Sequence, residues 1–194
     1  MRGIWDAVET NLQAKARMVR EGKAGGKGAL VLLLNNHFML QERLQANEQL
    51  ARFMGRSGER TGRMVEEDAR QLVQRTWLTP LQVLSGVHVP SRKLQSDGLY
   101  SRSSRHAIKQ ALSAFNSEVD AILNNKDLRI EEEVLRMHLV QSSCDFVLPV
   151  YAEFLDKFAS TRSFSKHPDK YLLYPLERLR PLLHSSLFAG HLSK

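Results

Sequence analysis

The sequence predicts an all-α protein, and three observations support this fold class. Apolar residues recur three or four positions apart along almost the whole chain, as on one face of a helix. Nowhere do four or more of them alternate with polar residues, as a half-buried strand requires. Aromatic residues make up only 7% of the 194 residues, and Leu, Arg, Glu, Gln and Ala, which favour helices, dominate the composition.

The first part of the chain predicts three helices. The first covers about 4–20, where apolar residues gather on one side. A run with four glycines and almost no apolar side chain, 21–28, predicts a connection. The second helix is expected over about 29–54, followed by a basic turn at 55–62. The third helix covers about 63–84.

The rest of the chain predicts three more helices. A sixth begins at Pro175, because proline suits the first turn of a helix. A fourth covers about 104–124, and its expected inward residues are Ile108, Leu112, Phe115, Val119 and Ile122. The fifth, about 128–159, has the most regular pattern. Its expected inward residues step by four and three: Ile130, Val134, Met137, Gln141, Cys144, Leu148, Tyr151, Leu155 and Phe158.

These helices are expected to form one continuous helical segment over 1–194. Mostly short connections favour antiparallel neighbours, and the predicted architecture is an elongated stack of helical bundles. The longest irregular stretch, 86–102, holds two glycines, a proline and three serines. A sub-bundle boundary is predicted there, with helices one to three in 1–85 and helices four to six in 103–194.

The net charge of +7 at pH 7 and the pI near 9.8 restrict the partners. Residues 161–194 are the densest basic segment, with six Lys and Arg against two Asp and Glu. A basic balance indicates nucleic acid, an anionic membrane or an acidic protein surface, without choosing among them. The longest apolar run, Ala29–Leu34, is far shorter than the roughly 20 residues that cross a bilayer, so any membrane contact is expected to be peripheral.

No enzyme chemistry, cofactor or metal is predicted. The glycine- and lysine-rich run at 22–28 lacks the spacing of a phosphate-binding loop, and no two of the seven histidines share a metal-ligand spacing with a carboxylate. Cys144, the only cysteine, lies on an apolar stripe, where a buried thiol is more common than a nucleophile. Asn35 and Asn36 follow a buried apolar run and are interpreted as structural amides that hydrogen-bond neighbouring backbone.

Basic residues cluster around the last turn of the chain. Clusters of charge are usually solvated faces, and this interpretation is preferred for the basic groups earlier in the sequence. The exposed backbone and charge of the last turn suit an anionic surface. Its candidate binding residues are Arg162, Lys166, Lys170, Arg178 and Arg180.

Five motifs from Ile4 to Phe188, in order, resemble the C-terminal part of the Exo-seventy family, the seventy-kilodalton subunit of the exocyst tethering complex. They are `LQAKARMV` with `LVLLLNNHFML`, then `RTWLTPLQVL`, `IKQALSAFNSEVDAIL`, `LPVYAEFLDKF` and finally `FSKHPDKYLLYPLERL`. The last is similar to the family's closing motif Lys-Asn-Pro-Glu-Lys-Tyr.

The resemblance implies a non-enzymatic role in exocytosis, in which secretory vesicles are tethered to the cytoplasmic face of the plasma membrane. It implies partners among the other exocyst subunits, and it admits a Rho-type small GTPase. In the family, lysines of the closing motif bind phosphatidylinositol bisphosphate, and Lys166 and Lys170 match two of them. A third family lysine falls at Leu173, a loss for which Arg162, Arg178 and Arg180 are expected to compensate.

Two alternatives stay open from the residues alone. A basic helical protein also attracts the phosphate backbone of nucleic acid, although no recognition helix or aromatic-basic alternation supports this and no nucleic acid is expected. The other alternative is a protein–protein scaffold without lipid contact.

Overall fold

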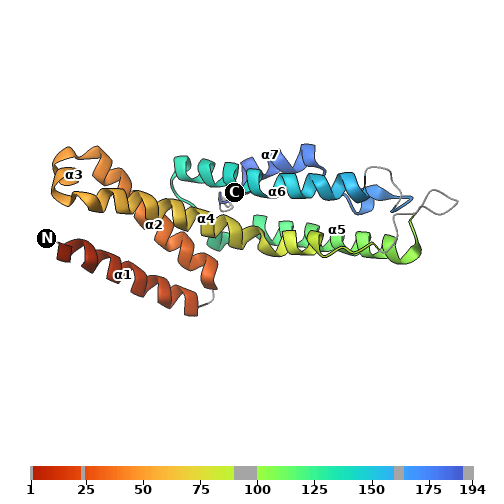
Figure 1. The fold of residues 1–194 in the computed structure, drawn as a ribbon, viewed down its shortest axis with the longest axis horizontal. Helices are drawn as coiled ribbons and strands as arrows, with labels where there is room; N and C mark the ends of the chain where they lie inside the picture. Colours follow the sequence, from red (N-terminus) through yellow and green to blue (C-terminus); the bar gives the residue numbers. More distant parts are fainter. Residues whose placement is uncertain (1, 23–24, 90–99, 160–163, 190–194) are drawn as a thin grey trace. The chain divides into compact units, whose positions relative to one another are not determined.

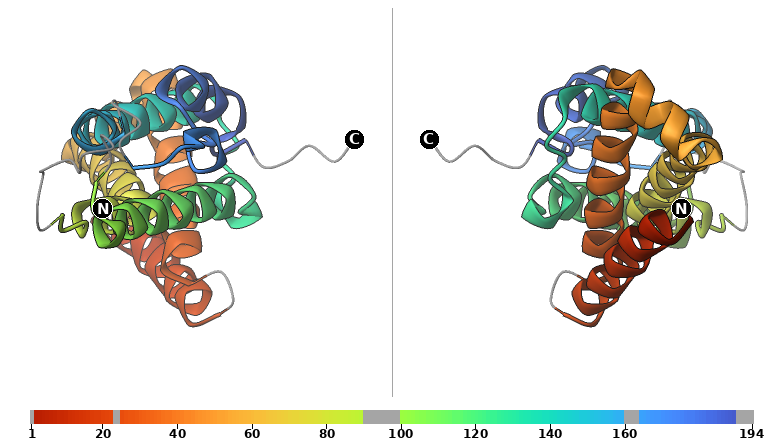
Figure 2. Two further views of the ribbon diagram at one scale, coloured as in Figure 1. Left: turned by 90° about the vertical axis from the view of Figure 1, so that its right-hand side faces the viewer. Right: turned by 90° about the vertical axis from the view of Figure 1, so that its left-hand side faces the viewer.

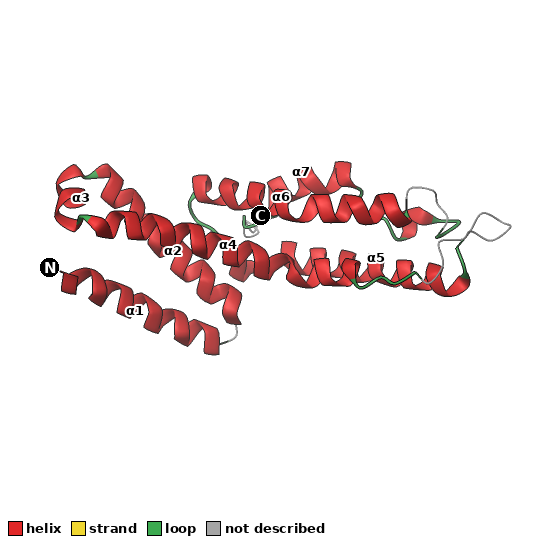
Figure 3. Ribbon diagram, viewed as in Figure 1, coloured by secondary structure: helices red, strands yellow, loops and turns green. Residues whose placement is uncertain are grey.

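The chain folds into helices, and the computed structural model describes residues 2–22, 25–89, 100–159 and 164–189. No strand occurs within these ranges (Figure 3). The all-α fold class is therefore confirmed. The elements are α1 (Arg2–Glu21), α2 (Gly25–Ala46), α3 (Glu48–Met54), α4 (Arg56–Ser85), α5 (Arg102–Leu123), the 3-10 turn η1 (Lys126–Leu128), α6 (Glu133–Phe158), the 3-10 turn η2 (Pro168–Lys170) and α7 (Leu176–Ser186).

The chain divides into two compact units. Unit 1 consists of Met1–Arg75, Asn125–Leu139 and Phe188–Lys194, and unit 2 of Thr76–Asn124 and Val140–Leu187. The predicted boundary at 86–102 falls largely on residues 90–99, outside the described residues, and stays a prediction, as does the elongated stack.

In unit 1, α1 packs along α2, as Figures 1 and 2 show. Their shared core consists of Leu12 and Ala16 from α1 and Ala29 and Leu33 from α2, all buried. Ala16 and Ala29 are each 1% exposed, and such small side chains let two helix backbones approach closely. The predicted first helix is therefore present, with Trp5 also buried at the start of α1, although Val8, which was expected on the same face, is exposed.

The glycine-rich connection predicted at 21–28 is shorter than expected. Helix α1 continues to Glu21, and α2 already begins at Gly25, whose φ of +60° suits glycine. Glycine costs about 1 kcal/mol relative to alanine inside a helix. Burial of Gly28, Ala29 and Leu30 outweighs that cost, because helices in proteins are stabilised mainly by tertiary packing.

The second predicted helix, 29–54, is wrong as a single element, and so is the basic turn at 55–62. Asn47 leaves helical geometry, and its side chain accepts a 2.9 Å hydrogen bond from the Leu50 amide, capping the start of α3. Gly55, with a φ of +51°, is the only residue between α3 and α4. The remainder of the predicted turn is the first part of α4, and Thr61 is fully buried there.

Unit 2 contains the best predicted helix. Ser101 caps α5 by accepting a hydrogen bond from the Ser104 amide at 3.3 Å. All five residues expected to face inward are buried: Ile108, Leu112, Phe115, Val119 and Ile122. The ring of Phe115 stacks on that of Tyr151 from α6, with centroids 4.3 Å apart, so α5 and α6 share one core.

The fifth predicted helix is present from Glu133 to Phe158, but its predicted start is too early and the inward face predicted for its first turns is wrong. Residues Arg129 to Glu132 are not helical, and α6 begins at Glu133. Val134 and Met137, expected to face inward, are 74% and 44% exposed, and Gln141, also expected to face inward, is exposed too. The buried face there contains Leu135, Leu139, Val140 and Val147. Apolar residues surround α6, and periodicity alone does not choose a face on such a helix.

Candidate functional site

The basic turn predicted near the end of the chain is an ordered segment, residues 164–174, called the C-terminal turn below. Phe164 and Pro168 are buried and anchor it. Pro168 begins η2, where proline lacks only an amide hydrogen that the helix does not use. The Pro168 carbonyl accepts hydrogen bonds from the amides of Tyr171 at 2.8 Å and Leu172 at 3.0 Å. Internal bonds therefore give this turn a defined backbone.

Side chains of α5 fasten the C-terminal turn in place. The buried Asn116 amide donates a 2.8 Å hydrogen bond to the carbonyl of Tyr171. One helical turn further, Asp120 accepts a short hydrogen bond from the hydroxyl of Tyr174. The rings of Phe164 and Tyr171 meet edge to face, with centroids 6.3 Å apart. The turn is thus tied to a helix more than forty residues earlier in the chain.

A pocket of about 330 Å³ opens between the C-terminal turn and the start of α5. We call it the basic pocket. Its lining combines four cationic side chains with two aromatic rings, and no carboxylate of the described residues takes part. The lining residues are Arg105, Lys109, Phe164, Ser165, Lys166, His167, Lys170 and Tyr171.

The cations of the basic pocket are available to an anion. Arg105 and Lys109 are four residues apart and so share one face of α5. The Lys109 ammonium lies 5.1 Å from the centre of the Tyr171 ring. This cation–π contact positions the ammonium group and leaves its positive charge in place. Lys166 and Lys170 are exposed, and none of the four cations forms an ion pair with another described residue.

The structure gathers only some of the predicted binding residues. Lys166 and Lys170 line the basic pocket together. Arg162 lies within 160–163, outside the described residues. Arg178 and Arg180 are exposed on α7 and do not line the pocket.

The charges of Arg178 and Arg180 act elsewhere in unit 2. Burial, followed by the hydrogen bond and charge of Asp120, raises the pKa of Tyr174 to about 12, and Arg178 opposes that shift. Burial raises the pKa of Cys144, and Arg180 opposes that one. The lipid-binding role of both arginines stays a prediction.

Arg105 and Lys109 are members of the pocket that the sequence did not connect to the last turn. In the sequence, only their spacing of four residues linked them. This spacing predicts that they share a helix face, but it does not predict which segment packs against that face. Roughly sixty residues separate them from Lys166 and Lys170. Only tertiary packing brings the two groups together.

The paired asparagines lie in unit 1. Asn36 donates a 2.7 Å hydrogen bond to the Leu32 carbonyl within its own helix. Asn35 donates a long one, 3.5 Å, to the carbonyl of Arg129 just after η1, and its own carbonyl oxygen is buried without a partner in the described chain. Both line a depression of about 340 Å³ together with Asp127. Their contacts are to backbone, as a structural amide makes.

The described residues contain neither a candidate metal cluster nor a helix suited to cross a membrane. No three or more of their His, Cys, Asp or Glu side chains converge in a way that suits a metal ion. None of the described helices combines the length and the apolar character needed to span a bilayer.

Comparison with known families identifies the fold. The family defined by the C-terminal region of Exo70, a component of the exocyst complex, matches residues 1–185. The chain belongs to this family. Nearly the whole sequence is matched, so both units lie within the Exo70 C-terminal region.

Individual Exo70 proteins show the same relationship. The chain is 28% identical over 192 residues to exocyst complex component EXO70A1 of Arabidopsis thaliana, a match that covers 96% of the chain and 29% of the relative. It is 24% identical over 170 residues to exocyst complex protein EXO70 of Yarrowia lipolytica, a match that covers 87% of the chain and 27% of the relative. Exocyst complex component 7 of Drosophila melanogaster is 29% identical over 85 residues, a match that covers 43% of the chain and 12% of the relative. The chain therefore spans under a third of the length of these relatives.

Proposed function

We propose that this protein acts in exocytosis as a non-enzymatic exocyst subunit and that its basic pocket binds the headgroup of phosphatidylinositol bisphosphate. The observation that carries the lipid part is the convergence of Arg105, Lys109, Lys166 and Lys170 on one pocket to which no described carboxylate contributes. The exocyst part is supported by membership of the Exo70 family and by three relatives named as exocyst components.

The shape of the pocket supports a multiply charged headgroup. A volume of about 330 Å³ suits a ring with several phosphates better than a single small anion. Lysine and arginine side chains are the usual partners of phosphate, as a point charge and as a planar fork respectively. The Phe164 and Tyr171 rings also line the pocket, and the Lys109 ammonium lies 5.1 Å from the centre of the Tyr171 ring.

The expected strength of this site fits a tether better than an autonomous anchor. Each Lys or Arg near an anionic leaflet contributes about 1 kcal/mol, so four contribute about 4 kcal/mol. This free energy corresponds to a dissociation constant of about 1 mM. Avidity within a multisubunit complex raises such weak contacts to useful affinity. We therefore propose the other exocyst subunits as partners, with a Rho-type small GTPase as a candidate regulator, and a peripheral location at the cytoplasmic face of the plasma membrane.

Liposome flotation with and without phosphatidylinositol bisphosphate tests the lipid site. Lys166→Glu with Lys170→Glu should abolish bisphosphate-dependent binding and leave the helical circular dichroism unchanged, because both side chains are exposed. The matched control is Lys126→Glu with Arg129→Glu, which makes the same change of charge at exposed positions outside the pocket. If both double variants lose lipid binding equally, the loss reflects overall charge, and the basic pocket is not the lipid site.

The nucleic-acid alternative is tested in parallel. A filter-binding titration with duplex DNA and single-stranded RNA at physiological salt should give little retention of either. Tight retention that the Lys166 and Lys170 variant abolishes would assign the basic pocket to a phosphate backbone instead of a lipid.

A further inference from the structure

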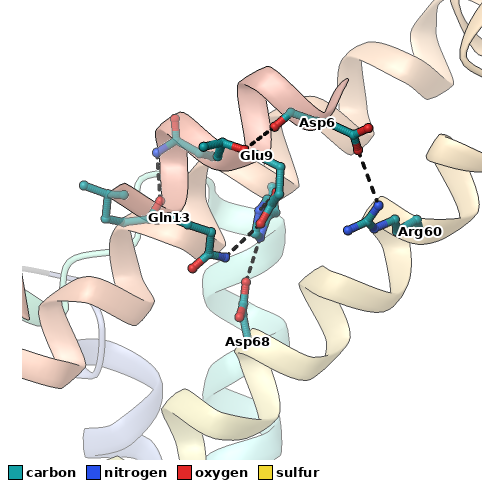
Figure 4. A network of polar contacts seen from close by, with 9 residues as sticks. Asp6, Glu9, Gln13, Arg60 and Asp68 are labelled. Atoms are coloured by element: carbon teal, nitrogen blue, oxygen red, sulfur yellow. Dashed lines mark hydrogen bonds and ion pairs between the residues drawn. The ribbon is translucent and has the colours of Figure 1, made fainter. Parts of the chain in front are cut away.

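His37 in unit 1 is a buried ionisable side chain to which the proposed function assigns no role. It lies on α2, and only 1% of it is exposed. Its Nδ1 is 2.7 Å from Oδ2 of Asp68 on α4, and its Nε2 is 3.0 Å from Oε2 of Glu9 on α1. Figure 4 shows Glu9 and Asp68 reaching toward each other from these two helices. One imidazole ring thus joins three helices through two carboxylates.

The two short contacts require one proton more than neutral histidine carries. A neutral imidazole has one N–H donor and one lone pair, and an ionised carboxylate only accepts hydrogen bonds. With a neutral ring, one nitrogen would therefore face a carboxylate oxygen, lone pair against lone pair. A protonated ring donates from both nitrogens and satisfies both carboxylates. The geometry by itself indicates that an excess proton is held at this site.

The surroundings hold the carboxylates in position. Gln13 donates a 2.8 Å hydrogen bond to the other oxygen of Glu9, so that this carboxylate is fixed from both sides. Arg60 of α4 faces Asp6 of α1, with the closest nitrogen and oxygen atoms 3.9 Å apart. The open pocket next to the ring, about 430 Å³, is lined by Gln13, His37, Arg60, Arg63, Met64, Glu67 and Asp68.

The charges facing His37 therefore have both signs. Glu9 comes from α1, and Arg60, Arg63, Glu67 and Asp68 come from α4. The negative ones are nearest, since Glu9 and Asp68 touch the ring, whereas Glu67 is bonded to Arg70 and Gln71. Burial lowers the pKa of His37, and the hydrogen bonds and charges of Asp68 and Glu9 together raise it further, so that it ends above its ordinary value.

We propose that His37 is a proton-dependent clamp that fastens α1 to α2 and α4. With the ring protonated, α1 is held by its apolar contacts with α2 and by the bond from His37 to Glu9. When the ring loses its proton, one bond becomes a repulsion between lone pairs, and α1 loosens from α2. The Glu9 bond is added to the apolar contact of Leu12 and Ala16 with Ala29 and Leu33, so that its loss weakens the hold of α2 on α1 without removing it.

The direction of the pH effect follows from the proton count. The folded protein holds the His37 proton more tightly than the unfolded chain, in which histidine titrates near pH 6.5. The stabilisation is therefore complete below about pH 6.5 and is lost as the pH rises through the folded-state pKa of His37. Over that window, the equilibrium constant for opening of α1 should rise up to about tenfold per pH unit.

Hydrogen–deuterium exchange of the α1 amides across this pH range is the main test, with each rate normalised to the chemical exchange rate and α5 as internal reference. In the wild-type protein, α1 protection should fall as the pH rises above about 6.5, while α5 protection stays constant. In Glu9→Gln, the new amide can donate to a neutral ring and still accept from Gln13. Its α1 protection should therefore no longer depend on pH. His138→Gln, at an exposed position of α6, is the matched control and should behave as wild type.

An α1 protection that is independent of pH in the wild type, or one that falls equally in Glu9→Gln, would overturn the clamp. Nuclear magnetic resonance titration of the His37 ring in the wild-type protein decides the question if Glu9→Gln does not fold. A ring that keeps its proton above pH 6.5 supports the proposal, and a ring that loses it below that value contradicts it.

Discussion

The side-chain amide of Asn116 on α5 donates a 2.8 Å hydrogen bond to the backbone carbonyl of Tyr171, which joins the C-terminal turn to the helix that supplies Arg105 and Lys109. Asn116 is 4% exposed, so no bulk solvent competes for this bond. This bond therefore helps to align the two halves of the basic pocket, beside the hydrogen bond from Tyr174 to Asp120.

Replacing Asn116 by alanine should lower the free energy of unfolding by about 1 to 3 kcal/mol, the usual effect of leaving a buried polar group without its partner. Urea denaturation measures this, with Ser117→Ala, at the exposed neighbouring position, as the control. Lipid binding by Asn116→Ala should also weaken, because the C-terminal turn loses its alignment with α5. Unchanged stability and unchanged lipid binding would show that this bond does not position the turn.

The α5 cations should matter for lipid binding more than those of α7. Arg105→Gln with Lys109→Gln removes two charges from the pocket, at about 1 kcal/mol each, and should weaken binding to bisphosphate-containing vesicles about 30-fold at low salt. Arg178→Gln with Arg180→Gln removes two charges outside the pocket and should have a clearly smaller effect. A larger effect of the α7 double variant than of the α5 double variant would mean that the lipid site is on α7.

The hydroxyl of Tyr174 should lose its proton at a higher pH than an ordinary tyrosine. Burial and the bond to Asp120 raise its pKa from 10.0 to about 12, so the folded protein holds this proton more tightly than the unfolded chain. The corresponding stabilisation is complete below pH 10 and is lost as the pH rises toward 12. Carbon-13 resonances of labelled tyrosine should show this, and Asp120→Asn should lower the pKa part of the way. A Tyr174 that titrates near 10 in the wild-type protein would contradict the bond.

The stacked pair of Phe115 and Tyr151 should dominate the stability of unit 2. Both rings are fully buried, and truncation of a buried phenylalanine to alanine costs about 3 to 5 kcal/mol. Phe115→Ala is therefore expected to shift the urea midpoint strongly, whereas Ser113→Ala, exposed on the same helix, should leave it unchanged. A loss below about 1 kcal/mol would mean that the α5–α6 core is not packed as described.

Where a helix has one apolar stripe, the sequence predicted both the helix and its buried face. In α5 every residue expected to face inward is buried, because polar residues occupy the rest of its circumference. In the first half of α6 apolar residues lie on several sides, and the wrong face was chosen, with Val134 and Met137 exposed and Leu135 and Leu139 buried. Glycine was the other source of error: packing extends α2 back to Gly25, whereas a positive φ at Gly55 does end α3.

From the sequence alone came the all-α class, the family, and the two lysines of the last turn, because these depend on local periodicity, residue order and motif spacing. Only the tertiary structure joined Lys166 and Lys170 to Arg105 and Lys109, and only it placed His37 between Glu9 and Asp68. The reason is physical. Contacts between residues far apart in the chain are set by how helix faces pack, and a sequence pattern reports which face is apolar without naming the face it will meet.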